Sequence, residues 1–323
     1  MLQRFVALLR EWTLPVAMTA GAVVYLVFAF ADPLDEFGNA MLPVVDTMLP
    51  VFMAMILFTN FCRVDYSALR LESWHVWVTA VQLLTVAAVT VVAVTAATGD
   101  TTTVLAEGTL TCVIAPGAAA AAVVTAKLGG DIESMTSYTF LSNVVTALAV
   151  PLVFPLVDPS VDMPFLTSFL HILFKVSMVL LVPMLAAYVV KHHMPRLLRF
   201  MNSIEDLSFY MWGASLSIVT GYTVRNIVHA DVGVGVLLLM AGASALLCVL
   251  QFIFGRGVGN RFSRTVEGGQ ALGQKNTTFA IWIACTYLSP LAAVVPGCYI
   301  LWQNTVNSIE LWHHKTGKDS VTE

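Results

Sequence analysis

A lysine within a long apolar stretch is the residue of this chain best suited to take part in chemistry. Lys275 lies in the polar segment Gly273-Gln274-Lys275-Asn276, between apolar residues that would otherwise form one membrane helix. A charge near the centre of a bilayer costs several kcal/mol unless it faces protein or water. We therefore predict that Lys275 faces the protein interior. There its charge can attract an anion, or it can lose and regain a proton, because burial favours the neutral form of a lysine.

A second interruption lies at Pro116-Gly117, between the apolar runs TLTCVIA and AAAAAVVTAK. Proline lacks an amide hydrogen and glycine relaxes the backbone, so a helix can stop there. Unwound backbone is tolerated at membrane depth only where it lines a cavity or packs in protein. Helices that restart after Gly117 and near Thr277 would aim free amide groups into such a cavity, and each helix end carries about +0.5 elementary charge. Together they predict an anion site. Taken singly, each interruption is equally consistent with a kinked or polar packing helix.

The composition indicates that lipid surrounds these elements. Hydrophobic residues make up 58% of the 323 residues, charged residues 11%, and the mean hydropathy is +0.81. A soluble domain would carry about 25% charged residues, so we predict an integral membrane protein. The net charge of −4 shows no basic excess, which argues against a nucleic-acid partner.

Metal, cofactor and enzyme chemistry are not expected. The five cysteines lie singly in apolar stretches, without the paired spacing that a disulfide framework or a zinc site needs. The sequence has no HExxH motif, no GxSxG motif and no paired aspartates in its apolar stretches, so we predict that the chain is not an enzyme.

Apolar stretches between polar residues predict an all-α fold with ten membrane spans. They run at about 12–31, 40–62, 74–97, 103–128, 133–157, 165–191, 204–227, 231–255, 265–288 and 290–312. With a cytoplasmic N-terminus, thirteen of the 16 lysines and arginines fall on the cytoplasmic side. This asymmetry predicts that both termini are cytoplasmic, and we expect the bacterial inner membrane as the location.

Ten spans divide into two halves of five, which enter the membrane from opposite sides. An inverted repeat of five plus five spans is therefore predicted. The interrupted fourth and ninth spans occupy corresponding places in the two halves. Paired interruptions of this kind are the best sequence indication of a transporter binding site, where the two broken helices cross.

Several motifs carry a family resemblance. The run from Pro116-Gly117 to Val123-Val124-Thr125, followed by Gly130-Asp131, resembles the fourth-helix pattern PGGTASNVVT of the bile acid:sodium symporter family. The ninth-span ALGQKNT resembles that family's EVGMQNS, and Gln82 in AVQLLTV matches its third-helix AQ. The chain thus resembles transporters of the apical sodium-dependent bile acid type.

The resemblance implies one transmembrane unit, residues 1–323, that works by alternating access between two domains. A panel domain would comprise about 11–73 and 165–228, and a core domain about 74–157 and 229–312, with helices four and nine crossing in the core. Residues 313–323 would form a cytoplasmic tail.

The departures from the family pattern bear on the driving ion. The resemblance implies sodium ligands on the fourth, fifth and ninth helices. The aligned positions here are Ala121, Ala122, Met135, Thr139, Ala271 and Lys275. Sodium prefers hard oxygen ligands. Alanine and methionine side chains offer none and an ammonium group repels the ion, so transport is predicted to be sodium-independent.

Lys275 is expected to replace the bound cation. Its ammonium would lie near the family's sodium position, held by carbonyl groups and by Gln82, Gln274 and Asn143. Two roles stay open: a proton carrier that couples solute to protons, or a fixed charge that supports uniport or exchange. Glu267 is the one acid placed to carry a proton, but pairing with Arg261 or Arg264 is favoured.

The expected substrate is a small organic anion, and no other cofactor or partner is implied. The candidate substrate contacts are Gly117, Lys275, Asn276, Thr277, Asn143, Asn304 and Gln303, and the coupling and crossover residues are Lys275, Gln82, Gln274, Pro116 and Thr139. Isolated amide side chains in spans more often form interhelical hydrogen bonds. The alternatives are a cation/proton antiporter of the same crossed-helix fold and a non-transporting sensor. An antiporter needs a carboxylate on the fifth span, where this chain has Ser142-Asn143.

Overall fold

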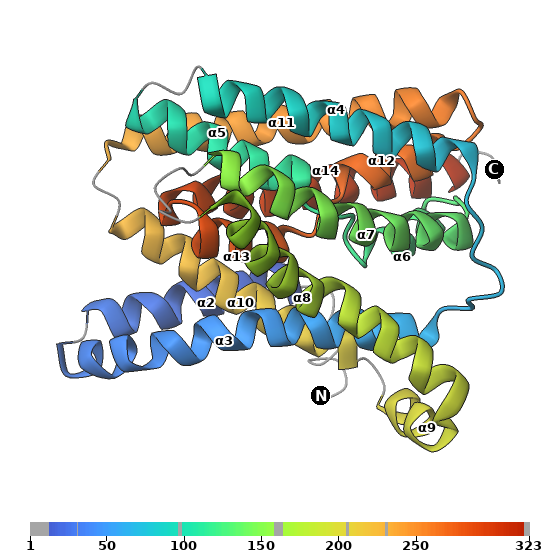
Figure 1. The fold of residues 1–323 in the computed structure, drawn as a ribbon, viewed down its shortest axis with the longest axis horizontal. Helices are drawn as coiled ribbons and strands as arrows, with labels where there is room; N and C mark the ends of the chain where they lie inside the picture. The colour runs from blue at the N-terminus through green and yellow to red at the C-terminus, as the bar shows by residue number, and fades with distance from the viewer. Residues whose placement is uncertain are drawn as a thin grey trace. The chain divides into compact units, whose positions relative to one another are not determined.

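The computed structural model describes residues 13–30, 32–95, 99–157, 164–204, 207–229 and 232–319, and within these ranges it contains helices and no strand. The elements are α2 (Thr13–Phe30), α3 (Asp32–Arg63), α4 (Ser73–Thr95), α5 (Asp100–Ile114), α6 (Ala121–Lys127), α7 (Ile132–Val157), α8 (Phe165–His193), α9 (Pro195–Ser203), α10 (Leu207–Val228), α11 (Val234–Asn260), α12 (Thr265–Gly273), α13 (Thr277–Tyr287), the 3-10 turn η1 (Pro290–Ala293) and α14 (Val294–Asp319). The all-α prediction is confirmed for the described residues (Figure 1).

Five of the described helices are long and apolar enough to cross a membrane. They cover Pro43–Arg63, Ser73–Thr95, Ile132–Val157, Phe165–His193 and Val234–Asn260. Three shorter apolar helices lie at Pro15–Phe30, Thr101–Ile114 and Thr277–Tyr287. A helix or a pair of helices lies at each position where a span was expected, whereas the count of ten crossings and their orientation stay predictions.

The chain divides into two compact units. The first consists of Met1–Arg63 and Val182–Asp231, and within it α2, α3 and α10 pack against one another. Gly21 permits the contact between α2 and α10, because a Cβ atom there would lie 2.0 Å from the carbonyl oxygen of Ser217. A larger residue at this position would force the two helices apart.

The second unit consists of Val64–Leu181 and Val232–Glu323. In it α11 packs against α12 and α14, and α4 packs against α5 and α7. Glycine again sets the closest approach: a Cβ atom on Gly268 of α12 would lie 2.3 Å from the carbonyl oxygen of Gly255 on α11. The short helix α12 is therefore held by backbone-to-backbone packing.

Both expected interruptions exist and both lie in the second unit. The helix α5 ends at Ile114, before Pro116, and α6 begins at Ala121. Likewise α12 ends at Gly273 and α13 begins at Thr277 (Figure 1). Proline and glycine end α5 as predicted. At the second interruption, the amide oxygen of Asn276 accepts a hydrogen bond from the Phe279 amide at 3.1 Å and caps α13.

Candidate substrate and coupling site

The two interruptions pair with each other through their backbones. The Ala118 amide donates to the Gln274 carbonyl at 2.9 Å, and the Asn276 amide donates to the Pro116 carbonyl at 2.9 Å. Gly117 and Lys275 thus face each other in an isolated antiparallel bridge. In both hydrogen bonds, the amide comes from the residue that follows Gly117 or Lys275, and the carbonyl comes from the residue that precedes the other one. The arrangement therefore has local two-fold symmetry.

The same symmetry extends to the amide groups of the two central residues. The Gly117 amide donates to the Ser142 hydroxyl on α7 at 2.8 Å, and the Lys275 amide donates to the Gln303 side-chain oxygen on α14 at 2.9 Å. In each case the acceptor comes from the helix that follows the broken span. Amides freed by the interruption are satisfied within the protein, as buried backbone groups must be.

A glutamine and a tyrosine support each interruption from neighbouring helices. The Tyr138 hydroxyl of α7 donates to the Gln82 side-chain oxygen of α4 at 3.1 Å, and Gln251 of α11 donates to the Tyr299 hydroxyl of α14 at 2.9 Å. The Tyr299 hydroxyl donates in turn to the Gly273 carbonyl at 2.8 Å. The two glutamine–tyrosine pairs therefore occupy matching places around the two interruptions.

Tyr138, Gln251 and Tyr299 were not among the residues chosen from the sequence. A signal for the tyrosines was present: Tyr138 precedes Ser142 by four residues, and Tyr299 precedes Gln303 by four. Four residues place two side chains on one face of a helix. A search for the same spacing in the fifth and tenth spans would have found both tyrosines.

The ammonium group of Lys275 lies at the C-terminal end of α5. It donates to the Val113 carbonyl at 3.4 Å and to the Ala115 carbonyl at 3.2 Å, and the residue is only 1% exposed. The Gln82 amide donates to the same two carbonyls at 3.2 Å each. Since the C-terminal end of a helix carries about −0.5 elementary charge, the lysine sits where a cation is electrostatically favoured.

These contacts supply donors to two carbonyls at the C-terminal end of α5, those of Val113 and Ala115. The first four amides and last four carbonyls of a helix lack partners within it. The Ile114 carbonyl accepts from the Thr146 hydroxyl at 2.9 Å, between the two carbonyls that Lys275 and Gln82 share. The Pro116 carbonyl accepts a hydrogen bond from the Asn276 amide, as described above. The broken end of α5 is thus a set of carbonyls closed by a charged donor.

The positions aligned with sodium ligands are mostly apolar in their surroundings. Ala121, Met135 and Ala271 belong to one buried apolar cluster, together with Trp74, Val78, Tyr138 and Leu272. The Thr139 hydroxyl is engaged by its own helix, donating to the Met135 carbonyl at 3.0 Å. The side chains of Ala121, Met135 and Ala271 therefore pack with other apolar groups.

Of the remaining predicted residues, some form hydrogen bonds at the crossing and others only within their own helix. Gln303 contacts the crossing directly, whereas Asn304 donates to the Ile300 carbonyl of its own helix at 2.7 Å. Asn143 likewise donates to the Thr139 carbonyl at 2.8 Å. The side-chain oxygens of Asn143 and Gln274 are buried and have no hydrogen-bond partner among the described residues. Thr277 is buried at the start of α13.

A polar seam continues along α14 from Gln303. The Gln270 amide of α12 donates to the Asn307 side-chain oxygen at 2.9 Å and to a Glu310 carboxylate oxygen at 3.1 Å. Glu310 also forms an ion pair with Arg256 of α11. The seam ties α12 to α14 on the side of the crossing where α12 begins.

Glu267 belongs to a separate ionic cluster centred on Arg264. The guanidinium contacts the carboxylates of Glu72 at 3.1 Å, Asp131 at 3.0 Å and Glu267 at 3.5 Å. The Ser134 amide, and with it the Arg264 side chain, holds the pKa of Asp131 below its ordinary value, although partial burial acts in the opposite direction. Glu267 therefore pairs with Arg264 and also accepts from the Asp131 amide at 2.7 Å.

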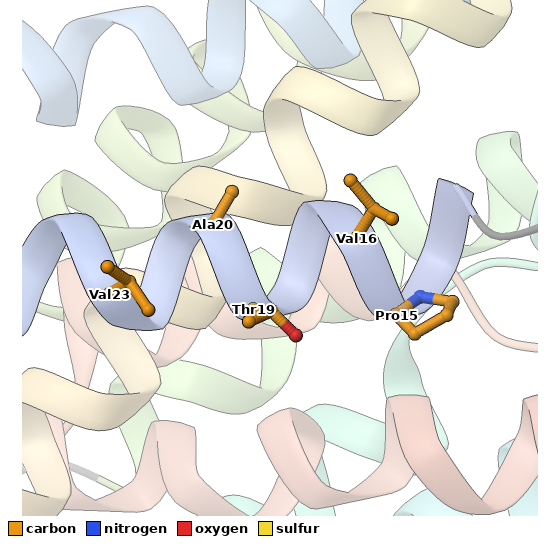
Figure 2. A pocket seen from close by; sticks show the side chains of 5 residues that line it. All are labelled: Pro15, Val16, Thr19, Ala20 and Val23. Carbon is orange, nitrogen blue, oxygen red and sulfur yellow. The ribbon is translucent and has the colours of Figure 1, made fainter. Parts of the chain in front are cut away.

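A shallow hollow on α2, in the first unit, is built differently. Figure 2 shows its lining: Pro15, Val16, Thr19, Ala20 and Val23, all from one helix. Its one polar side chain is Thr19. A hollow of this composition suits contact with lipid chains rather than a charged solute.

Comparison with known families identifies the family of the chain. The sequence matches the profile of the Sodium Bile acid symporter family over residues 50–230, more than half of the chain. The chain belongs to this family. The resemblance inferred from the motifs is thereby confirmed, and the protein is a membrane transporter of the bile acid symporter type.

Members of the symporter family are transporters, not enzymes. The matched range contains Pro116-Gly117 and ends before Lys275. No curated protein sequence matches the chain.

Proposed function

We propose that this member of the symporter family transports a small organic anion without sodium, with Lys275 in the place of the bound cation. The observation that carries the proposal is the ammonium group of Lys275, buried against the Val113 and Ala115 carbonyls. A bound cation at a helix C-terminus offsets the negative end of the helix dipole. A covalently attached ammonium supplies such a charge without an ion taken from solution.

The surrounding side chains support sodium independence. Three positions that would hold oxygen ligands carry Ala121, Met135 and Ala271, which pack in one apolar cluster. A sodium ion placed there would meet carbon atoms and a neighbouring positive charge. Desolvation of an ion without ligands is strongly unfavourable, so the site favours the lysine.

The local two-fold symmetry at Gly117 and Lys275 supports ten spans arranged as an inverted repeat of five plus five. We assign the first compact unit as the panel and the second as the core, with the boundary inside α8. Movement of one against the other would give alternating access. Gly117, Asn276 and Thr277 are the proposed substrate contacts, with Gln303, Asn143 and Asn304 framing the site. Gln82, Gln274, Pro116 and Thr139 support the crossover.

Uptake by proteoliposomes tests the proposal. The solute is first identified by screening organic acids and zwitterions for thermal stabilisation of the purified protein. Uptake of that solute should be equal in sodium and in choline buffers, and strict dependence on sodium would refute the proposal. An imposed pH gradient then assigns the role of Lys275: uptake driven by the gradient identifies a proton carrier, and indifference identifies a fixed charge.

A further inference from the structure

The short helix α9 has a strongly two-sided surface. Around its axis, Leu197, Leu198 and Met201 share one side, and Arg196 and Arg199 lie on the opposite side with Ser203. The three apolar side chains are half-buried, in line with the packing of α9 against α3. Both arginines are exposed, and no residue of α9 is fully buried.

Chain connectivity places α9 at a membrane surface. The preceding helix α8 is long and apolar enough to cross a bilayer and ends at His193, with Met194 as the single residue between the two helices. Figure 1 shows α9 as a separate helix that turns away from the end of α8. A helix of nine residues is about 14 Å long, so α9 stays within reach of the headgroup layer. Phe200 of α9 (60% exposed) and Met194 directly before it (46% exposed) are apolar and suit that layer.

Basic residues also gather in this region. Lys191, His192 and His193 end α8, directly before Arg196 and Arg199. Within the described residues, neither Arg196 nor Arg199 forms an ion pair with a carboxylate, and the Arg199 Nε group donates only to the Pro195 carbonyl at 3.4 Å. The acids that follow α9 in the sequence, Glu205 and Asp206, lie outside the described residues.

We propose that α9 and the end of α8 bind the headgroups of anionic phospholipids. The exposed side chains of Met194 and Phe200 enter the headgroup–acyl boundary, while the guanidinium groups of the two arginines bind the lipid phosphates. The proposal requires that α8 crosses the bilayer, and it is independent of Lys275 and of the transported solute. It identifies the occupant as the bilayer itself, because the basic residues and the exposed apolar residues lie together where a membrane helix ends.

Native mass spectrometry of the full-length protein in a zwitterionic detergent tests the site. The dissociation constants of the tightest-bound phosphatidylglycerol and phosphatidylcholine molecules are measured by titration. We expect phosphatidylglycerol to bind more tightly, by about fivefold for each arginine engaged. The double variant R196Q/R199Q should lose about tenfold or more of this preference, and R196K/R199K should keep most of it.

A matched control separates a site from diffuse positive charge. R70Q/R261Q removes two exposed arginines that lie outside α3, α8 and α9, and it should leave the preference unchanged. An equal loss in R70Q/R261Q and R196Q/R199Q, or equal binding of the two lipids by the unaltered protein, would overturn the proposal. Melting temperatures in lipid-free detergent should agree between R196Q/R199Q and the parent, because both arginines project away from the protein.

Discussion

Gly117 and Lys275 occupy matching positions in the two interruptions, and their backbones are bonded alike. Each lies opposite the other in the antiparallel bridge. The amide of each donates a hydrogen bond to a side chain of the span that follows. Beyond the backbone they differ fully. Gly117 has no side chain, whereas the side chain of Lys275 reaches the broken end of α5.

This comparison separates the scaffold from the charge. The two-fold arrangement builds a pair of broken helix ends, and such ends can be closed by any suitable donor. One end, at Gly273, is closed by the neutral Tyr299 hydroxyl, and the other by an ammonium together with the neutral Gln82 amide. A symmetric backbone therefore carries an asymmetric charge, and in the proposed function this charge selects for an anion.

Removal of the charge should have the largest effect. We expect K275M to abolish uptake and to lower the free energy of unfolding by about 2–3 kcal/mol, because hydrogen bonds from a charged donor are worth about 1.5–3 kcal/mol. Uptake in proteoliposomes and thermal melting in detergent measure the two effects. The control K127M removes an exposed lysine and should change neither. Full uptake by K275M would exclude the lysine from the mechanism.

A methyl group should discriminate between the two interruptions. At Gly273 an added Cβ would lie 2.4 Å from the ring of Phe252, whereas at Gly117 its nearest neighbour, Tyr138, would lie at 3.7 Å. We therefore expect G273A to lower stability by about 1–3 kcal/mol through overpacking. G117A should change stability by less than about 1 kcal/mol, a shift typical of ordinary substitutions. Equal melting temperatures for the two variants would contradict the packing described for Gly273.

The two amide caps provide a smaller and symmetric test. S142A and Q303L each leave one buried amide, that of Gly117 or Lys275, without its acceptor. An unsatisfied buried group costs about 1–3 kcal/mol, so both variants should lose stability to a similar extent. Thermal melting of S142A and of Q303L, each compared with the parent protein, measures the two losses. S142T keeps the hydroxyl and serves as the control for S142A. A large loss from one cap alone would mean that the two-fold symmetry is only geometric.

The ionic cluster around Arg264 should contribute least, and its contribution should depend on pH. Because the pKa of Asp131 is lower in the folded protein than in the unfolded chain, its stabilisation is complete above the unfolded value of about 3.9. It is lost as the pH falls through the lower folded value. We expect D131N to lower stability at neutral pH by about 1 kcal/mol or less, since the side chain is 38% exposed. The difference between D131N and the parent should narrow below about pH 4; a constant difference at every pH would rule out the ionised carboxylate as its source.

Much of the scaffold could be predicted from the sequence. Apolar runs of about 20 residues can only be helices in a membrane, since every backbone group must be bonded within the segment. The interruptions at Pro116-Gly117 and before Thr277 were visible as proline, glycine and polar residues in apolar runs. Burial of Lys275 could be predicted because exposing a charge to lipid is energetically unfavourable.

The partners of these residues could not be predicted, because they come from helices far apart in the chain. Nothing in the sequence marks Gln251 and Tyr299 as partners, but in the folded protein Gln251 donates to the Tyr299 hydroxyl, which donates to the Gly273 carbonyl. Asn304, one residue after Gln303, turns to its own helix because a helix rotates neighbouring residues by about 100°. The sequence by itself determined which residues must be buried and where the helices break. Only the tertiary structure decided which donor meets which broken end, since that choice depends on the approach and rotation of packed helices.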